Sequence, residues 1–494
     1  MFRNLISKLK GVLARMGLIK GLKKVTDLKD VITTDEFYVH LSKWIAIYKG
    51  YHPDWHDLKY TTLNGRKKRR MRSMRMGKVV ASEMANLVFN EKCSISIGSK
   101  NGGTDEFEKN ILNVLSKNAF YKKFQDFLEF MFAMGGMVIK AYVIDDKIKL
   151  SYVTADCFIP VADDGRQITE GIFVNESRKG DKYYTHLEWH LWENGVYVVR
   201  NELYESHQKG ELGVKIPLDT LYQGLEEEVT IQGLKRSLFV YFKPNIANSV
   251  DLDSKLGIPL FADALDTLYS LDTAFDSFNR EFRLGKKRIT VPTSAIQTVV
   301  DEHGMMHRYF DADDEVYEAF NFEGDKQEAK EHVTTLRVDE HISAINTLLE
   351  ILAFQTGFSP GTFTFDGQGL KTATEVVSEN SKTYRSRSGH ITLVEEGLKD
   401  LIQVIADLGA LYDLFTVPTD FETKANFDDS IAEDRDTNAT YWIKLVQNEV
   451  ASKLQAIMKI QKVTEEDAVK ILNQIKSENQ TVGADQVDWF GSDG

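Results

Sequence analysis

One stretch, residues 337–411, constrains the fold more than any other, because two long helical patterns enclose a segment that cannot be helical. Apolar residues recur every three or four positions over Arg337–Thr356 and again over Lys371–Leu411, which is the period of a helix with one buried face. Residues 357–369 between them hold four glycines and a proline, residue types that interrupt a helix. The sequence therefore predicts a helix–loop–helix unit at the centre of the fold.

Three aromatic side chains on this glycine-rich loop leave two interpretations open. Phe358, Phe363 and Phe365 fill the core in an ordinary connection, which is the commoner fate of phenylalanine. Alternatively, the loop packs on a partner or lines a passage.

Length and charge narrow the function classes. The 494 residues suffice for about three ordinary domains or one large multi-part subunit. The net charge of −13 argues against a typical free nucleic-acid-binding protein, which is basic overall. Cys93 and Cys157 form no CxxC pair, so a disulfide scaffold and a cysteine zinc site are excluded. No apolar run approaches the ~18–20 residues of a membrane span, so we expect no integral membrane insertion.

Two segments are strongly basic. Residues 1–25 carry Lys and Arg but no acidic residue, as in an amphipathic arm that touches a membrane, nucleic acid or an acidic partner; a partly ordered arm is the alternative. We interpret the second segment as the start of a helix that continues over residues 79–89, and as an interaction patch. It could bind phosphates, but the acidic chain slightly favours pairing with other copies or with another acidic protein surface. The patch consists of Arg66, Lys67, Lys68, Arg69, Arg70, Arg72 and Arg75.

The remaining periodicities indicate an α+β chain with a mainly antiparallel sheet region. A helical period of three to four recurs in the N-terminal part, and a period of two begins at Met137. The predicted helices cover 35–48, 105–116 and 120–134, and the predicted strands cover 138–143, 149–153, 157–161, 171–176, 183–192, 196–203, 238–243 and 416–427. Three short helices are predicted over 434–446, 451–460 and 464–476.

A further long helix is predicted from Pro259 to about Gly285, with an apolar stripe and an acidic face. Asp263, Asp266 and Asp276 lie on that face, which on the residues alone is a solvated helix face. A short acidic insert over residues 295–325 follows, in which Asp311, Asp313 and Asp314 cluster without the spacing of an EF-hand loop.

Motifs for catalysis are not found, so we expect no enzyme and no cofactor. His186 and His190 lie four apart in a strand-like pattern, which separates their rings by about 13 Å, too far for one metal ion. Residues 367–372 lack the spacing of a phosphate-binding loop. Two alternatives stay open: a nucleic-acid-processing enzyme that holds Mg²⁺ on Asp311, Asp313 and Asp314, and a membrane-associated assembly scaffold that uses residues 1–25.

Three segments resemble the portal proteins of tailed bacteriophages, in particular those of phages that infect Gram-positive hosts. They are Gly369–Thr383, Lys78–Glu91 and Asn426–Ile431, and the resemblance extends over about residues 30–480. It implies a portal fold of wing, stem, clip and crown, closed into a dodecameric ring at one capsid vertex of the virion. The implied partners are double-stranded DNA, the terminase, the major capsid and scaffolding proteins, and the head-tail connector proteins.

The resemblance also implies a division of the chain. A basic arm (1–29) precedes the wing (30–248), the first stem helix (249–284), the clip (285–336) and the second stem helix (337–355). A channel loop (356–371), a long wing helix with a return strand (372–428), a helical crown (429–478) and a disordered tail (479–494) follow.

Three groups of site residues follow from the same resemblance. Asp263, Asp266 and Asp276 form an acidic channel wall, and Asp311, Asp313 and Asp314 form the docking face of the clip. The channel loop meets DNA through Phe358, Thr362, Phe363, Thr364, Phe365, Gln368 and Lys371.

Overall fold

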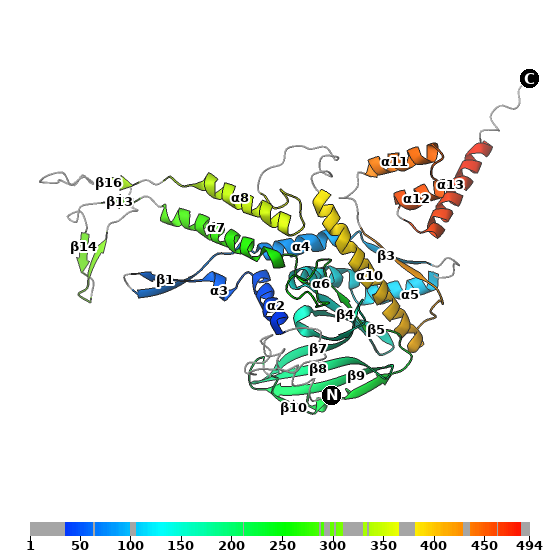
Figure 1. Cartoon of the computed structure of the whole chain (residues 1–494), viewed down its shortest axis with the longest axis horizontal. Helices are drawn as coiled ribbons and strands as arrows, with labels where there is room; N and C mark the ends of the chain where they lie inside the picture. The colour runs from blue at the N-terminus through cyan, green and yellow to red at the C-terminus, as the bar shows by residue number, and fades with distance from the viewer. Residues whose placement is uncertain are drawn as a thin grey trace, which may run out of the picture.

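The structure, a computed structural model, combines helices with antiparallel sheets, which confirms the predicted α+β class. An arm of two long helices projects from the body, and a separate group of three helices lies near the C-terminus (Figure 1). The structure describes residues 35–62, 65–98, 105–210, 212–285, 288–290, 297–300, 303–309, 330–332, 335–364, 381–427, 435–461 and 463–485.

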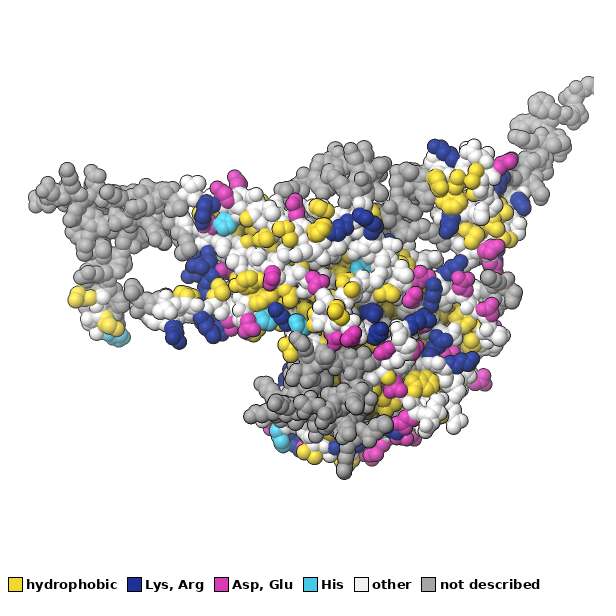
Figure 2. All heavy atoms as spheres, in the orientation of Figure 1, with side chains coloured by type: hydrophobic (Ala, Val, Ile, Leu, Met, Phe, Trp, Pro, Cys, Tyr) yellow, Lys and Arg dark blue, Asp and Glu magenta, His cyan; other side chains and the backbone are white. Residues whose placement is uncertain are grey.

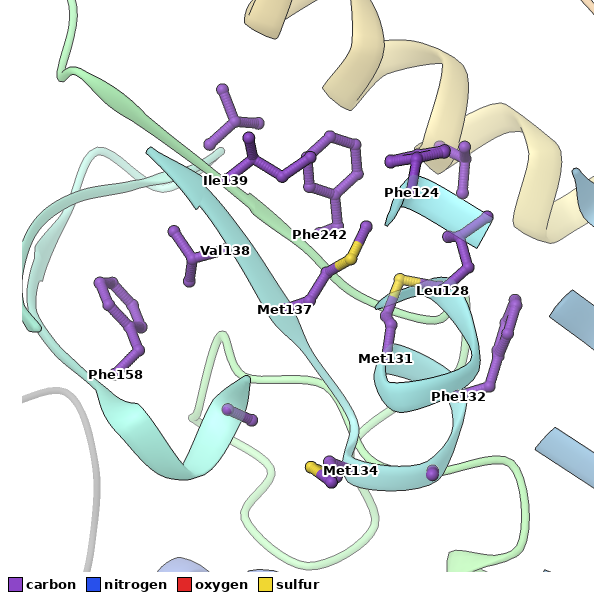
Figure 3. Packing of buried hydrophobic residues seen from close by; sticks show 14 of the residues in the cluster. Phe124, Leu128, Met131, Phe132, Met134, Met137, Val138, Ile139, Phe158 and Phe242 are labelled. Carbon is purple, nitrogen blue, oxygen red and sulfur yellow. The ribbon is translucent and has the colours of Figure 1, made fainter. Parts of the chain in front are cut away.

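The core of the body forms where helices pack on a three-stranded sheet of order β12-β4-β5. Helix α6 lies at its centre, because its apolar residues recur at helical spacing and are fully buried; Figure 3 shows Phe124, Leu128 and Phe132 beside Met137 and Phe242 of the sheet. The helices are α2 (Asp35–Tyr48), α4 (Met76–Val88), α5 (Asp105–Lys117), α6 (Phe120–Met134) and α10 (Ser381–Leu411), and the strands are β4 (Met137–Ile144), β5 (Lys147–Thr154) and β12 (Phe239–Phe242).

A second, larger antiparallel sheet has the order β10-β9-β8-β7-β6, with β11 also paired to β9. It lies below the helices of the body in Figure 1. Its strands and turns confirm the predicted period of two. The elements are β6 (Phe158–Asp163), β7 (Ile168–Lys179), β8 (Lys182–Glu193), β9 (Val196–Ser206), β10 (Val214–Ile216) and β11 (Glu228–Ile231), with short 3-10 turns at Ala155–Cys157 and Leu218–Thr220.

Local turn chemistry explains the hairpin between β4 and β5. Asp145 and Asp146 both have positive φ, +49° and +53°, as a two-residue turn between twisted strands requires. The return strand predicted within residues 416–427 is also present, as β17 (Glu422–Asn426), which pairs antiparallel with β3 (Ser94–Gly98). Segments more than 300 residues apart in the chain are thereby joined in one sheet.

The arm consists of α7 (Leu265–Leu284) and α8 (Val338–Gln355). Helix α7 begins later than predicted, after a 3-10 turn at Ala262–Ala264, and ends at Gly285 as expected. Small strands follow at its far end. They are β13 (Arg288–Thr290) paired with β16 (Lys330–His332), and β14 (Gln297–Val300) paired with β15 (Met306–Tyr309).

The C-terminal group comprises α11 (Arg435–Gln447), α12 (Lys453–Gln461) and α13 (Glu465–Asp485). Thr464 caps α13: the Asp467 amide donates to its Oγ1 at 3.2 Å, and its hydroxyl donates to Asp467 Oδ2 at 2.8 Å. Because α13 continues to Asp485, the start of the predicted disordered tail at residue 479 was wrong.

The basic run was also assigned to the wrong element. It forms strand β2 (Gly65–Arg70), which pairs with β1 (Asp57–Thr62). Strand β1 directly follows the short helix α3 (Pro53–His56) in the sequence. Helix α4 begins only at Met76, after Arg75 at a φ of +56°. Two signals in the sequence favour the hairpin: the dipeptide Asn64-Gly65, and the alternation of Leu58 and Tyr60 with polar residues.

His390 of α10 makes the stability of the body depend on pH. Its ring is buried, and its Nδ1 accepts a hydrogen bond of 3.0 Å from the backbone N–H of Asn245. Burial lowers the pKa of His390 from 6.5 to about 4, because the buried site disfavours the charged imidazolium.

We therefore expect His390 to destabilise the fold as the pH falls from about 6.5 to about 4, since the unfolded chain takes up the proton first. The loss reaches about 3 kcal/mol at the acid end of this window. Urea unfolding of the wild type and of His390→Gln across this window measures it, and the variant should show a flatter slope. His207→Gln, at an exposed position, is the matched control, and an equal slope in wild type and His390→Gln would contradict the assignment.

Candidate functional site

The two arm helices are aligned by polar contacts at both ends. Near the body, Thr267 Oγ1 donates to Gln355 Oε1 at 2.7 Å, and at the far end Arg337 donates to both carboxylate oxygens of Glu281 at 3.1 and 2.9 Å. Apolar residues between these contacts are buried, namely Leu268, Leu271, Ile345 and Leu349. The arm is thus an antiparallel pair in fixed register.

The β1–β2 hairpin is attached to α7 through two carboxylates one helical turn apart. Arg69 donates to both oxygens of Asp276 at 2.9 and 2.6 Å, and the Arg72 amide adds a bond of 3.1 Å. Asp272 accepts from the Met74 amide at 2.7 Å and lies 3.1 Å from His56 Nε2. Both carboxylates are buried, so their charges are compensated by the hairpin rather than by water.

The pKa values of these carboxylates reflect their partners. Burial raises the pKa of Asp272 against the opposing effect of its hydrogen bonds. Burial acts on Asp276 in the same direction, yet the bonds from Arg69 and Arg72 hold the pKa of Asp276 below its usual value. Asp276 is therefore a buried anion with its own cation.

The basic patch divides between the two faces of its strand, because side chains alternate along β2. Leu58, Tyr60 and Arg69 line a cavity of about 330 Å³ together with Arg280 and Arg283 of α7. On the other face, Lys68 pairs with Asp57 at 2.6 Å. The remaining contacts are those of Arg70, over the Tyr51 ring and to the Gly50 carbonyl, and of Arg72, to Asn279.

Lys and Arg side chains accordingly gather over the hairpin and the adjacent end of α7 (Figure 2). Arg66, Lys67 and Arg75 of the patch are exposed. We define Arg69, Arg280 and Arg283, around the cavity, as the arginine cluster.

The predicted acidic wall is only partly present as an acidic surface. Asp263 and Asp266 are exposed, and Asp263 accepts a bond of 2.6 Å from Ser249. Asp276 is instead buried beneath the hairpin and paired with Arg69. Its place in the predicted wall was wrong, because a partner some 200 residues earlier in the chain covers it.

The predicted channel loop begins as a packed turn. Phe358 is 0% exposed and meets the partly buried Phe363 edge to face at 5.0 Å. Ser359 is buried and joined to Thr383 of α10, whose Oγ1 accepts from the Ser359 amide at 2.8 Å. Phe358 is therefore a core residue and not a contact for DNA in this conformation, as the first of the two interpretations of the loop expected.

The other loop residues divide into two groups. The hydroxyls of Thr362 and Thr364 donate to the carbonyls of Ser359 and Gly361, at 2.7 and 3.2 Å. Gly357 and Gly361 have φ of +84° and +85°, which glycine adopts without strain. Phe365, Gln368 and Lys371 lie outside the described residues, as do Asp311, Asp313, Asp314 and the basic arm 1–29.

The histidine pair is part of a sheet, as predicted. His186 bonds to Asn201 at 3.0 Å, and the buried His190 lies between Tyr197 and Glu188 at 2.7 and 2.8 Å. Throughout the described ranges, no group of three or more His, Cys, Asp or Glu side chains could hold a metal ion. None of the helices within those ranges is both long and apolar enough to cross a bilayer.

Sequence reasoning missed Asp272 and His56 as parts of this site. Both are ordinary polar residues in the sequence, and their burial arises only when the hairpin folds onto α7. The hairpin signal at Asn64-Gly65 was the available indication that residues 57–70 form a separate element.

Comparison with known proteins gives one match over nearly the whole chain. The model of a family described as phage portal protein, SPP1 Gp6-like, matches residues 33–481. No curated protein sequence matches significantly.

Similar solved structures include two chains from gene transfer agent particles. One, from the virion of a native gene transfer agent particle, is 10% identical with a TM-score of 0.40, over 78% of this chain and 88% of that chain. Another, from the neck of an empty gene transfer agent particle computed with C6 symmetry, is 11% identical with a TM-score of 0.42, over 78% and 89%.

We expect Arg69→Met to destabilise the attachment of the hairpin by about 2 kcal/mol, because it leaves the buried Asp276 carboxylate without its cation. Hydrogen exchange of residues 57–70, together with chemical unfolding, measures the change. Lys68→Met, which removes an exposed pair, is the matched control and should cost less than about 0.5 kcal/mol.

The double variant Arg69→Met/Asp276→Leu tests the cause. It removes both charges, so its loss should be smaller than that of Arg69→Met alone. A double variant less stable than Arg69→Met would show that the ion pair is not what holds the hairpin.

Proposed function

The chain belongs to the phage portal protein family, and from this premise we propose that copies of it close into a dodecameric ring around a channel for double-stranded DNA. A member of this family is a portal subunit of the virion, located at the capsid vertex or neck. The match over residues 33–481 is the observation that carries the proposal, because it includes the body, the arm and the C-terminal helices.

In the proposed ring, the arm serves as the stem and residues 285–336 at its far end serve as the clip. The body, with α10 and β17, serves as the wing, and α11–α13 serve as the crown. The clip, with Asp311, Asp313 and Asp314, docks the terminase during packaging and the head-tail connector proteins afterwards. The wing and crown face the major capsid and scaffolding proteins.

The proposed channel conducts DNA by avoiding strong contacts. Asp263 and Asp266 are exposed near the junction of arm and body, and carboxylates repel phosphates at short range. Asp276 does not contribute, since Arg69 neutralises it. Among the loop residues, the proposed contacts to the DNA backbone remain Thr362, Phe363, Thr364, Phe365, Gln368 and Lys371.

The portal family is structural and non-enzymatic. We propose that this chain likewise hydrolyses no nucleotide and no nucleic acid, and that the terminase supplies the energy of packaging.

Electron microscopy of the purified protein, combined with native mass measurement, tests the proposed ring. We expect closed rings with a central opening and a mass of twelve copies of the 56.2 kDa chain. A chain that stays monomeric under all assembly conditions, or that hydrolyses ATP or DNA by itself, would overturn the proposal.

We expect rings carrying Asp263→Lys and Asp266→Lys to retain DNA and to package it more slowly. Each added cation beside the DNA releases a counterion, so DNA retention should rise and become more sensitive to salt. Filter binding over a salt series and a DNA packaging assay measure the two effects. Asp219→Lys with Glu226→Lys, at exposed positions of the sheet region, makes the same change of charge elsewhere and should change neither.

A further inference from the structure

The arm carries a positive edge formed by the hairpin and α7. The arginine cluster surrounds the cavity of about 330 Å³, whose other walls are Leu58 and Tyr60. Arg69 is already paired with Asp276. Arg280 and Arg283 are exposed, and neither forms an ion pair with a carboxylate of the described residues, although the charge of Arg280 helps to lower the pKa of Asp276. The edge therefore has unused capacity to bind a carboxylate through guanidinium groups.

The opposite edge of the arm carries two exposed carboxylates, beside Arg337, which is itself paired with Glu281. Asp339 and Glu340 are exposed in the first turn of α8. Figure 1 shows α8 on one side of α7 and the β1–β2 hairpin on the other. The acidic turn and the arginine cluster thus lie on opposite edges of the arm, where they cannot pair within one chain.

The register of α7 and α8 places the two edges at the same level along the arm. Glu281 meets both Arg337 and His341, the latter at 3.9 Å, while Thr267 meets Gln355. In this antiparallel alignment, Asp339 lies at nearly the same height along the arm as Arg283. In a ring, neighbouring copies are related by rotation about one axis, so residues at the same height along the arm stay at the same height in every copy. The edge with the arginine cluster in one copy then faces the edge with Asp339 and Glu340 in the next copy.

We propose that the arginine cluster of one copy receives Asp339 and Glu340 of the next copy. This inference rests on the proposed ring and adds the residues that set its contact. The occupant is a second copy because the chain itself presents the complementary charges at the matching level. In addition, exposed apolar side chains flank both sites, Phe282 at 46% and Ile342 at 39% exposure, and such side chains suit a protein interface.

Charge reversal at the aligned pair tests the proposal. Asp339→Arg should raise about tenfold the protein concentration at which half of the chains are in rings, and should lower the salt concentration at which rings dissociate. Arg283→Glu should have the same two effects on ring formation. The double variant Asp339→Arg/Arg283→Glu restores opposite charges and should recover most of the loss. Sedimentation velocity and native mass spectrometry over a salt series measure ring formation.

The matched control is Glu350→Arg, which makes an equal change of charge on an exposed position of the same helix, about 16 Å further along it. Combining it with Arg283→Glu should give no recovery. Thermal unfolding of each variant at low concentration separates loss of fold from loss of contact.

The outcomes are distinct. Wild-type rings whose stability is unchanged by Asp339→Arg and by Arg283→Glu, or a double variant no better than the singles, would overturn this contact while leaving the ring intact. Loss of DNA retention in Arg283→Glu rings of normal stability would overturn it in favour of a phosphate site. A wild type without rings would overturn the proposed function and this contact together.

Discussion

The burial of two negative charges on α7 is the constraint on which the arm depends. Asp272 and Asp276 lie one turn apart and have little access to water, so each requires a compensating donor. The hairpin supplies the guanidinium of Arg69, and the residues that flank it supply two backbone amides and an imidazole. That requirement fixes the segment between α2 and α4 against the helix, and it brings Arg69 beside Arg280 and Arg283. The buried acids thereby add Arg69 to the positive edge that Arg280 and Arg283 of α7 already provide.

Periodic elements of the body were predictable from the sequence because one local signal determines each of them. The apolar spacing of α6 and the Asp145-Asp146 turn of β4–β5 require no knowledge of distant residues. Whether an individual acidic side chain is exposed or buried could not be predicted in this way. Asp266 and Asp276 look alike in a helical pattern, and only the arrival of the hairpin makes one exposed and the other buried.

The same difference applies to the basic run and to the predicted loop. A dense cluster of charges concealed the hairpin signal of Asn64-Gly65, so strand β2 was taken for the start of a helix. Phe358 was predicted to contact DNA on the basis of the family resemblance, although its apolar ring is buried in the core. The buried contact between Ser359 and Thr383 joins the end of the arm to α10, which neither residue type alone would indicate. Resemblance therefore identified the architecture better than it identified the single side chains.

The antiparallel pairing of α7 and α8 also determines how the arm bears mechanical load. Both helices are rooted in the body, and their contacts lie at the two extremes of their overlap, Thr267–Gln355 and Glu281–Arg337. A pull along the arm on one helix alone tends to slide it past the other, so all the contacts between them resist together instead of separating one by one. The hairpin adds a further attachment on one flank of α7, through Asp276.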